Sequence, residues 1–459
     1  MDFMLESTNT MTKSDPVAAD GHAPRVGAGI DYEKFLDCVH CGLCTAACPT
    51  YLETGDENNS PRGRIYLMRS VVDGRLELSG KVAEHLDLCL DCRSCETACP
   101  SGVQYGRLIE PFRSSQRHAA AKAGQAENRD WFHRFILYGL FPFPKRMRWA
   151  LAPARLMQVL RIDRFLEFTG LTNLLPARLQ RMQRFLPKLL PGGPALPEFL
   201  PAIGPRRARV ALFTGCVADA VFRHTHWATA RVLQQNGCDV IVPREQVCCG
   251  AIHYHSGADG PALQMAQQNC SVFDASGVDA VIVNVAGCGS MLKDYGHIAH
   301  EFDPKNEAQH ERLSKTAAKM KDVSEFLAEL GLVPPTGEIK LRAVYQDACH
   351  LVHAQRVRDQ PRELLAQIPG LDIVAIAEPE ICCGAAGSYN LTEPEMSDRL
   401  AQRKLQNILA AKPQAVITGN VGCSMQIQAA LRKAGRDVWV AHPMELLDLS
   451  YRGINPRDI

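Results

Sequence analysis

Eight cysteines near the N-terminus fall into two copies of one spacing. The first copy runs from Cys38 to Pro49 and the second from Cys89 to Pro100, and both read C-x2-C-x2-C-x3-C-P. Three closely spaced thiolates can wrap one corner of an iron–sulfur cube, with their backbone N–H groups free to face its sulfides. The fourth cysteine then lies on a short helix that points the other way. The pattern therefore predicts two clusters that exchange their fourth ligands.

This spacing is typical of bacterial two-cluster ferredoxins and predicts two [4Fe–4S] clusters. Zinc is the alternative, but zinc knuckles normally supply paired C-x2-C units without a third cysteine or a trailing C-P. The predicted ligands are Cys38, Cys41, Cys44 and Cys99 for one cluster, and Cys48, Cys89, Cys92 and Cys95 for the other.

A second group of eight cysteines repeats another pattern in the C-terminal half. The first cysteine and the start of the following CC pair are 32 positions apart in one copy and 33 in the other. The second cysteine of that pair and the last cysteine are 39 and 40 positions apart. Agreement this close indicates a duplicated domain. The sequence leaves open whether these cysteines bind a further cluster. They are Cys216, Cys248, Cys249 and Cys288 in the first copy, and Cys349, Cys382, Cys383 and Cys423 in the second.

Short apolar or β-branched runs precede these cysteines, and helical stretches separate the runs. Such alternation predicts a mainly parallel α/β sheet, whose strand carboxyl ends form the ligand crevice. We expect the eight cysteines to gather there, four per half, across a pseudo-twofold axis. The expected strands are 209–213, 240–242, 281–285, 344–345, 373–376 and 416–418, and the expected helices are 225–235, 261–275 and 393–411.

Structural roles are favoured for the other notable residues near the cysteines. Ser60 followed by Pro61 predicts a helix N-terminus, and a solvated helix face is favoured for Arg62 and Arg64 over a role in tuning a nearby cluster. The two cysteines outside both patterns are interpreted as packing residues. Four histidines near the CC pairs are expected to support the site or the fold rather than to act as ligands. These residues are Cys238 and Cys270, and His253, His255, His350 and His353.

With both patterns in view, the chain resembles the glycolate oxidase iron–sulfur subunits over about residues 30–450. More distantly it is similar to the iron–sulfur subunits of anaerobic glycerol-3-phosphate dehydrogenase, lactate-utilisation complexes and heterodisulfide reductase. The resemblance is carried by 38–49, 61–67, 85–103 and both CCG blocks with 251–255.

The resemblance implies an electron-transfer subunit of a multi-subunit complex. An FAD-containing partner subunit would oxidise glycolate to glyoxylate, a further flavoprotein-type subunit would belong to the same complex, and electrons would pass toward a quinone or similar respiratory acceptor. It also implies a cytoplasmic protein, peripheral on the inner membrane. The alternatives are an equivalent subunit of a D-lactate or glycerol-3-phosphate dehydrogenase, a thiol–disulfide reductase acting at the CCG site, and a scaffold with structural clusters.

The chain departs from the wider family after each CCG motif. Heterodisulfide reductase-type domains close the motif with a further C-x-x-C, whereas Met291 and Gln426 occupy the matching positions here. Each half thus offers four thiols rather than five, which argues against a non-cubane cluster and disulfide-reducing chemistry. An ordinary third cluster, a cluster with His253 or His350 as a ligand, and an empty site stay open.

No motif for a flavin or nicotinamide cofactor is found. The sequence contains no G-x-G-x-x-G after a strand, no Walker A, no G-x-S-x-G and no H-E-x-x-H. Hydride chemistry needs a flavin or a nicotinamide, so a partner must take the hydride from a hydroxy acid and this chain passes single electrons.

The middle of the chain is basic and aromatic. Residues 129–190 contain twelve Lys and Arg against Asp130, Asp163 and Glu167, a net charge of +9 within a chain whose total is +1. This composition suggests an anionic membrane surface or an acidic partner, with helices that merely pack the domains together as the alternative. Nucleic acid is disfavoured. The longest nearly apolar run, 135–143, is too short to span a bilayer.

The expected fold class is multidomain α+β: an α-helical ferredoxin-like module with two [4Fe–4S] clusters, a helical connector and a duplicated α/β cysteine-rich (CCG) domain. The expected division is a disordered tail at 1–29, the two-cluster module at 30–110, the connector with a Pro-rich linker at 111–205, and the two repeats at 206–335 and 336–459.

Overall fold

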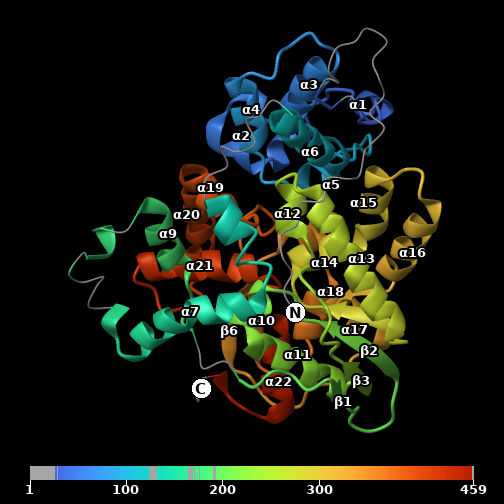
Figure 1. Ribbon diagram of the computed structural model, residues 1–459. Helices are drawn as coiled ribbons and strands as arrows, with labels where there is room; N and C mark the ends of the chain where they lie inside the picture. The colour runs from blue at the N-terminus through green and yellow to red at the C-terminus, as the bar shows by residue number, and fades with distance from the viewer. Residues whose placement is uncertain are drawn as a thin grey trace.

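The computed structural model describes residues 26–27, 29–122, 132–163, 169, 171–174, 176–189 and 193–456. Most of the expected tail lies outside these residues, as do Arg129, Trp131, Arg164 and the start of the Pro-rich linker. An N-terminal helical region sits on top of two α/β repeats, and the connector lies along one side of them (Figure 1).

In the described part of the N-terminal region, the regular elements are all helices. Ser60 caps the longest helix before residue 100, since its Oγ accepts a hydrogen bond of 3.0 Å from the backbone N of Gly63, as predicted. A buried core that includes Phe35, Met68 and Phe112 holds the helices together. The elements are α1 (Glu33–Leu36), η1 (Thr45–Ala47), α2 (Pro49–Thr54), η2 (Glu57–Asn59), α3 (Pro61–Val72), α4 (Gly80–Asp87), α5 (Ser94–Thr97) and α6 (Gly106–Lys122).

The first repeat is built on a five-stranded sheet of order β1-β3-β2-β4-β5. Its strands are parallel except β1, which pairs antiparallel with β3 at one edge. The central strand β4 is buried throughout and β2 is buried over its last four residues, as expected for a sheet covered on both faces. The elements are β1 (Phe199–Leu200), β2 (Ala208–Phe213), α10 (Val217–Val221), α11 (Arg223–Gln235), β3 (Cys238–Ile241), α12 (Ala251–His255), α13 (Asp259–Ala275), β4 (Ala280–Val283), α14 (Ala286–Lys293), α15 (Tyr295–Phe302), α16 (Glu307–Ala317), β5 (Met320–Asp322) and α17 (Val323–Leu330).

The second repeat has a four-stranded parallel sheet of order β7-β6-β8-β9. This is the order β3-β2-β4-β5 of the first sheet over again, so the duplication seen in the cysteine spacing is also a duplication of the fold. The elements are β6 (Leu341–Tyr345), η6 (His350–Ala354), α18 (Gln360–Leu365), β7 (Leu371–Val374), α19 (Tyr389–Thr392), α20 (Pro394–Ala410), β8 (Ala415–Ile417), α21 (Val421–Lys433), β9 (Trp439–Ala441) and α22 (Pro443–Arg452).

The connector touches both repeats. Arg148 forms an ion pair with Asp219 of the first repeat, and Arg181 forms one of 2.7 Å with Asp398 of the second. Within the described residues, no helix is both long and apolar enough to cross a membrane. The connector elements are η4 (Phe132–Leu137), α7 (Pro144–Val159), η5 (Leu171–Leu174) and α9 (Ala177–Phe185).

All of the expected strands and helices are present, with ends displaced by no more than three residues. The expected strand at 281–285, for example, is β4 (Ala280–Val283), and the expected helix at 393–411 is α20 (Pro394–Ala410). Strands β1, β5 and β9, which have two or three residues each, were not predicted. The prediction of parallel α/β architecture is confirmed for both repeats.

Candidate metal centres

The first predicted cysteine set lies close to the surface. Its four members, together with Arg62, Ile65, Cys95 and Tyr105, line one cavity. The loop between the cysteines turns tightly through His40 and Gly42, both with positive φ (55° and 85°). A Cβ at Gly42 would lie 2.4 Å from Nη1 of Arg62, so glycine lets this guanidinium approach the loop. Cys41 is exposed and Cys38, Cys44 and Cys99 are partly buried.

The second predicted set lies deeper. Cys48, Cys89 and Cys92 are buried, and with Cys95 they line a second cavity that also contains Pro61, Arg64, Leu90 and Tyr105. Pro61, Cys95 and Tyr105 line both cavities, so the two are neighbours. Polar groups already face these sulfurs. The backbone N of Asp91 donates to Cys89 Sγ at 3.4 Å, Tyr105 donates to the same sulfur at 3.6 Å, and the Thr50 hydroxyl lies 3.3 Å from Cys48 Sγ.

The spacing of the thiols suits a group larger than one metal ion. Around a single tetrahedral zinc with Zn–S bonds of about 2.3 Å, sulfurs would lie about 3.8 Å apart. Among the described residues, the only three His, Cys, Asp or Glu side chains whose ligand atoms all lie within 4.8 Å of one another are Asp91, Glu110 and His255. No three of the thiols meet that limit. An all-thiol donor set at wider spacing fits an iron–sulfur cluster better than zinc.

Arg64 is not on a solvated helix face, so that prediction is wrong. Its side chain is 1% exposed and lies against the second cysteine set. It donates to the backbone O of His85 at 2.7 Å and to Thr50 at 3.0 Å, and its Nη1 lies 4.0 Å from Cys48 Sγ. None of its contacts within the described chain is a carboxylate. Arg62 remains at the surface, where it pairs with Glu57 at 2.6 Å.

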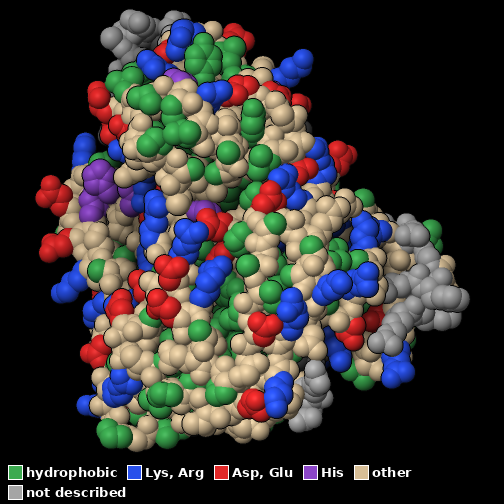
Figure 2. Space-filling view, turned by 180° about the vertical axis from the view of Figure 1, so that it is seen from behind, with side chains coloured by type: hydrophobic (Ala, Val, Ile, Leu, Met, Phe, Trp, Pro, Cys, Tyr) green, Lys and Arg blue, Asp and Glu red, His purple; other side chains and the backbone are tan. Residues whose placement is uncertain are grey.

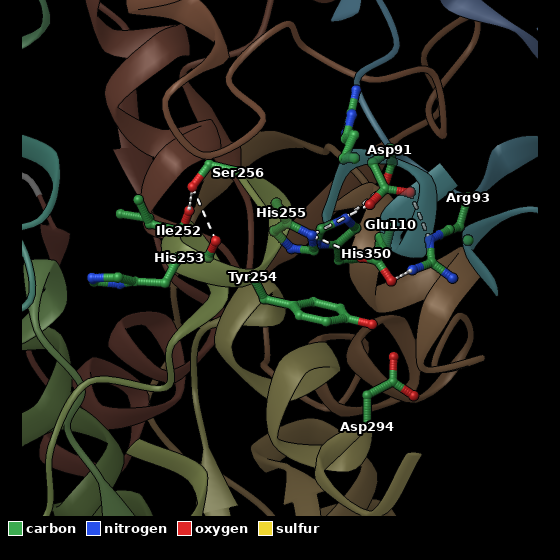
Figure 3. Close-up of polar contacts among 12 residues, drawn as sticks. Asp91, Arg93, Glu110, Ile252, His253, Tyr254, His255, Ser256, Asp294 and His350 are labelled. Atoms are coloured by element: carbon green, nitrogen blue, oxygen red, sulfur yellow. Dashed lines mark hydrogen bonds and ion pairs between the residues drawn. The ribbon is translucent and has the colours of Figure 1, made fainter. Parts of the chain in front are cut away.

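A buried ion-pair network surrounds the loop that carries Cys92. The Arg93 guanidinium lies 2.8 Å from Asp91 and 2.8 Å from Glu110 (Figure 3). It also lies 3.1 Å from Glu96. Arg93 and Asp91 both have left-handed backbone conformations (φ 62° and 52°), although neither is glycine. A Cβ at Gly106, the first residue of α6, would collide with the guanidinium, so Arg93 packs directly on that backbone.

His255 of the first repeat completes this network. Its Nδ1 lies 2.8 Å from Glu110 and 3.3 Å from Asp91 (Figure 3). Burial alone would lower the pKa of His255, but the hydrogen bonds to Asp91 and Glu110 outweigh it and raise the pKa to about 9. His255 is therefore a cation at neutral pH that fastens the N-terminal region to the repeat. The sequence analysis did not predict this network. Its only signal in the sequence was the pair of charged residues, Asp91 and Arg93, on either side of Cys92.

The cysteines of the repeats lie after the carboxyl ends of parallel strands, as expected. In the first repeat the sulfurs of Cys216 and Cys248 are 3.4 Å apart, as are those of Cys249 and Cys288. In the second repeat Cys349 and Cys382 are 4.0 Å apart, and Cys383 and Cys423 share one buried cluster.

The remaining predicted residues take structural positions. His253 stacks on Tyr138 of the connector, with ring centres 4.7 Å apart, and burial lowers its pKa. His350 lies 3.0 Å from the backbone O of Asp91, and His353 lies 2.9 Å from the Thr97 hydroxyl. Cys238 and Cys270 are fully buried in separate hydrophobic clusters, which confirms them as packing residues.

Met291 and Gln426, which stand where heterodisulfide reductase-type domains have a further cysteine, also take packing positions. Met291 is 3% exposed within the apolar core of the first repeat. Gln426 is 1% exposed; it donates to the Ser397 hydroxyl at 3.0 Å and accepts from Asn390 at 3.3 Å.

Three family models match parts of the chain. A 4Fe-4S dicluster domain matches residues 34–103, the linker region of the glycolate oxidase iron–sulfur subunit matches 128–186, and a cysteine-rich domain matches twice, at 210–293 and 343–428.

Curated relatives cover most of the chain. A Bacillus subtilis protein named "Probable glycolate oxidase iron-sulfur subunit" is 38% identical over 416 residues, which are 88% of this chain and 91% of the relative. The "Glycolate oxidase iron-sulfur subunit" of Escherichia coli is 32% identical over 417 residues, 88% of this chain and 92% of the relative. The "Lactate utilization protein A" of Oceanobacillus iheyensis is 33% identical over 246 residues, 53% of this chain and 98% of the relative.

Proposed function

Because this chain belongs to the family of glycolate oxidase iron–sulfur subunits, we propose that it relays electrons from a flavoprotein partner that oxidises glycolate to glyoxylate toward the respiratory chain. It is one subunit of an oxidoreductase complex, and its own part is electron transfer. The observation that carries the proposal is the pair of neighbouring cavities lined by two four-cysteine sets.

The two sets divide between two clusters as their spacing predicts. When bound, each [4Fe–4S] cluster accepts and releases one electron at a time. The ligands in this proposal are Cys38, Cys41, Cys44 and Cys99 for the first centre, and Cys48, Cys89, Cys92 and Cys95 for the second.

The surrounding residues set the conditions for that chemistry. Tyr105 and the backbone N of Asp91 donate to Cys89 Sγ, which stabilises the thiolate form that ligation needs. Leu90 and Ile65 are buried beside the cysteines and exclude water. The buried guanidinium of Arg64 supplies positive charge next to the second set.

The step on glycolate belongs to the partners. A flavin accepts the hydride, and this chain carries no motif for one, so the complex includes an FAD-containing glycolate-oxidising subunit and a further flavoprotein-type subunit. The partner that delivers electrons docks where the first set meets the surface. There Leu36, Val39, Leu43 and Tyr66 are 45%, 67%, 61% and 54% exposed around the exposed Cys41. Figure 2 shows apolar side chains gathered on this N-terminal region.

Reduction of the clusters by substrate tests the proposal. In the purified complex, glycolate reduces both centres, as EPR spectra record, and D-lactate and glycerol 3-phosphate reduce them more slowly. Cys41→Ala removes only the signal of the first centre, and Cys92→Ala removes only that of the second. Reduction by glycerol 3-phosphate but not by glycolate, or clusters that glycolate never reduces, would contradict it.

A second part of the proposal concerns attachment to the cytoplasmic face of a membrane, where a quinone could accept the electrons. Helix α7 and the turn after it present an apolar stripe at helical spacing: Trp149, Leu156 and Leu160 are 82%, 59% and 58% exposed. Lys145 and Arg146 at one end are exposed and make no ion pair within the described chain. An aromatic and apolar stripe beside bases suits the interface of an anionic bilayer.

Co-sedimentation with vesicles tests this attachment. The intact chain binds vesicles that contain phosphatidylglycerol and binds pure phosphatidylcholine weakly. Trp149→Ser with Leu156→Ser abolishes binding, whereas Val333→Ser, another exposed apolar residue outside the connector, leaves it unchanged. Unaltered binding by the double variant would assign this face to a partner subunit instead.

The domain division expected from the sequence completes the proposal. The two-cluster module at 30–110 receives electrons, the connector at 111–205 joins it to the repeats, and the repeats at 206–335 and 336–459 form the remaining body of the subunit.

A further inference from the structure

The sheets of the two repeats differ at one edge. In the first repeat β1 pairs antiparallel with the outer edge of β3, whereas β7, the counterpart of β3, is itself the edge strand of the second sheet. Strand β6 pairs with β7 in the register in which β2 pairs with β3, so each residue of β7 matches one in β3, beginning with Leu371 and Cys238. Within the described residues, no strand pairs with the outer edge of β7.

Without a covering strand, side chains of β7 are open to solvent. Val240 and Val242, which lie beside β1 in the first repeat, are 0% and 4% exposed. Of their counterparts in the second repeat, Ile373 is partly exposed and Ala375 is exposed. The same positions therefore belong to a closed core in the first repeat and to a surface in the second.

The segment of the second repeat that matches β1 lies elsewhere. Residues 332–333 occupy the place of 199–200 in the duplicated sequence, and a proline follows each pair. The backbone N of Val333 donates to Asn236 Oδ1 of the first repeat at 2.7 Å, and Leu332 packs against the core that the two repeats share. This segment thus joins the repeats to each other and does not cover β7.

The uncovered edge lacks the usual protection against pairing. Edge strands normally are very short, or carry Lys, Pro or a bulge. Strand β7 has four residues and continues through the apolar residues 375–377, and its one charged residue, Asp372, is paired with Arg342 at 3.3 Å. In the first repeat Pro243 ends the equivalent run. An apolar, unpaired edge of this kind favours the addition of a strand.

Backbone donors lie along this edge. In the first repeat the backbone N of Val242 donates to the backbone O of Glu198, which precedes β1, at 2.8 Å. Hydrogen-bonding groups alternate between the two sides of a strand, so by the same register the N–H groups of Ala375 and of Ile373, two residues earlier, face the open edge. An added strand would accept the hydrogen bonds that these groups offer.

The first repeat shows what kind of segment fits such an edge. Strand β1 ends a run in which Leu196 and Leu200 are 4% and 5% exposed. Between them, Glu198 pairs with Arg244 beyond the end of β3 at 3.1 Å. Beyond the end of β7 lies an open cavity whose lining includes Arg399. The expected occupant is therefore an extended segment with two apolar side chains four residues apart and a polar or acidic side chain between them.

A segment of a partner subunit is the occupant that the size of the edge favours. Pairing along four residues buries far less than the roughly 1,200 Å² of a stable protein–protein interface, so β7 alone would not hold two copies of this chain together. A segment of a subunit that already docks over the first cysteine set needs no such area, because its effective concentration at the edge is high.

We propose that the outer edge of β7 binds an extended segment of a flavoprotein subunit of the complex, which adds antiparallel to β7 as β1 adds to β3. The inference rests on the proposed function, which supplies the partner. The duplication has then produced one sheet edge that the chain closes itself and one that another subunit closes.

Amide hydrogen exchange of the full chain, alone and in the purified complex, tests the proposal. In the chain alone, the N–H groups of Ile373 and Ala375 exchange at least about tenfold faster than those of Val240 and Val242. In the complex they slow by at least about tenfold. Equal exchange of these two groups in the chain alone and in the complex would overturn the proposal.

Protection of this edge in the isolated chain would also overturn it. Protection that rises with protein concentration would assign the edge to a second copy of the chain. Protection that does not depend on concentration would assign it to another part of the same chain.

Removal of one amide tests the pairing without changing the cysteines. Ala375→Pro deletes an outward N–H at the end of an edge strand, where proline is tolerated, and weakens binding of the flavoprotein subunit at least about tenfold. Ala375→Ser keeps the N–H and binds like the wild type. Thermal melting checks that both variants are folded, and if the proline variant is not, the exchange measurements on the wild type still decide.

Equal binding of the wild type and both folded variants would overturn the proposal. Failure of glycolate to reduce the clusters of a complex in which β7 is protected would count against the proposed function alone.

Discussion

The two N-terminal cysteine sets share one spacing but differ in their surroundings. The first lies at the surface, with Cys41 exposed and Val39 and Leu43 open to solvent beside it. The second lies inside, against a fully buried Arg64 and next to the second repeat. Between the second and third cysteines, the first loop has Gly42 and the second loop has Arg93.

This contrast teaches that the ligand pattern selects the cofactor, whereas the residues around it select the role. A centre near solvent within an apolar patch can exchange electrons with another protein. A centre enclosed by protein, with a buried cation and N–H donors, is suited to pass electrons onward within the chain. Burial, charge and hydrogen bonding to the sulfurs are the factors that set cluster potentials.

The largest effect should come from the buried network of the second set. Arg93→Ala leaves Asp91, Glu96 and Glu110 without their guanidinium, and we expect it to lower the free energy of unfolding by about 3–5 kcal/mol. Urea denaturation of the reconstituted chain measures this. Arg62→Ala, which removes a surface guanidinium beside the first set, should leave the stability unchanged. Equal effects of the two variants on the free energy of unfolding would mean that the surroundings of the two sets do not differ in this way.

A smaller effect depends on pH and on His255. Its pKa is raised from 6.5 to about 9 in the folded chain, so its contribution is complete below pH 6.5 and disappears as the pH rises through about 9. The contribution should be about 1–3 kcal/mol. Thermal melts of the wild type should lose stability between these pH values, and those of His255→Gln should lose less. Parallel pH profiles would show that the ion pairs do not fasten the second set to the repeat.

Arg64 should affect the potential of the second centre. The reduced cluster carries one more negative charge, which the buried guanidinium stabilises, so Arg64→Gln should lower this potential by about 59 mV, a tenfold change for one electron. Arg64→Lys should restore part of the loss. EPR-monitored redox titration separates the centres, and Arg62→Gln serves as the matched variant. An unchanged second potential would mean that burial rather than charge distinguishes the two sets.

The smallest effect on the folded chain should come from the apolar patch over the first set. Val39→Ser with Leu43→Ser removes exposed apolar side chains and should change stability by no more than about 0.5 kcal/mol. Both potentials should stay the same, while the flavoprotein partner reduces the first centre several-fold more slowly. Stopped-flow mixing of the two proteins measures that rate. An unaltered rate would place the partner elsewhere on the surface.

Features that depend on neighbouring residues or on regular spacing could be predicted from the sequence alone. Regular cysteine intervals predicted the duplicated domain, and the alternation of apolar runs and helical stretches predicted its parallel sheets, both of which the structure contains. The division of the N-terminal cysteines into two ligand sets stays a prediction. A helix at Ser60 followed from a capping residue and a proline that act on their immediate neighbours.

The charged residues around the sets could not be interpreted in this way. Arg64 stands in a polar-looking helix, and only the packing of the cysteine loops over it makes it buried. His255 is 164 residues from Asp91 along the chain, and nothing in the local pattern pairs them.

The left-handed turns at Asp91 and Arg93 have a consequence for maturation of the protein. These two residues lie within the loop that would close around the proposed second cluster, and their side chains also form the seam with α6 and α12. Cofactor insertion and docking of the N-terminal region onto the repeats therefore draw on the same backbone conformation. In the proposed function, loading of the second cluster and docking of the N-terminal region onto the repeats would then depend on each other.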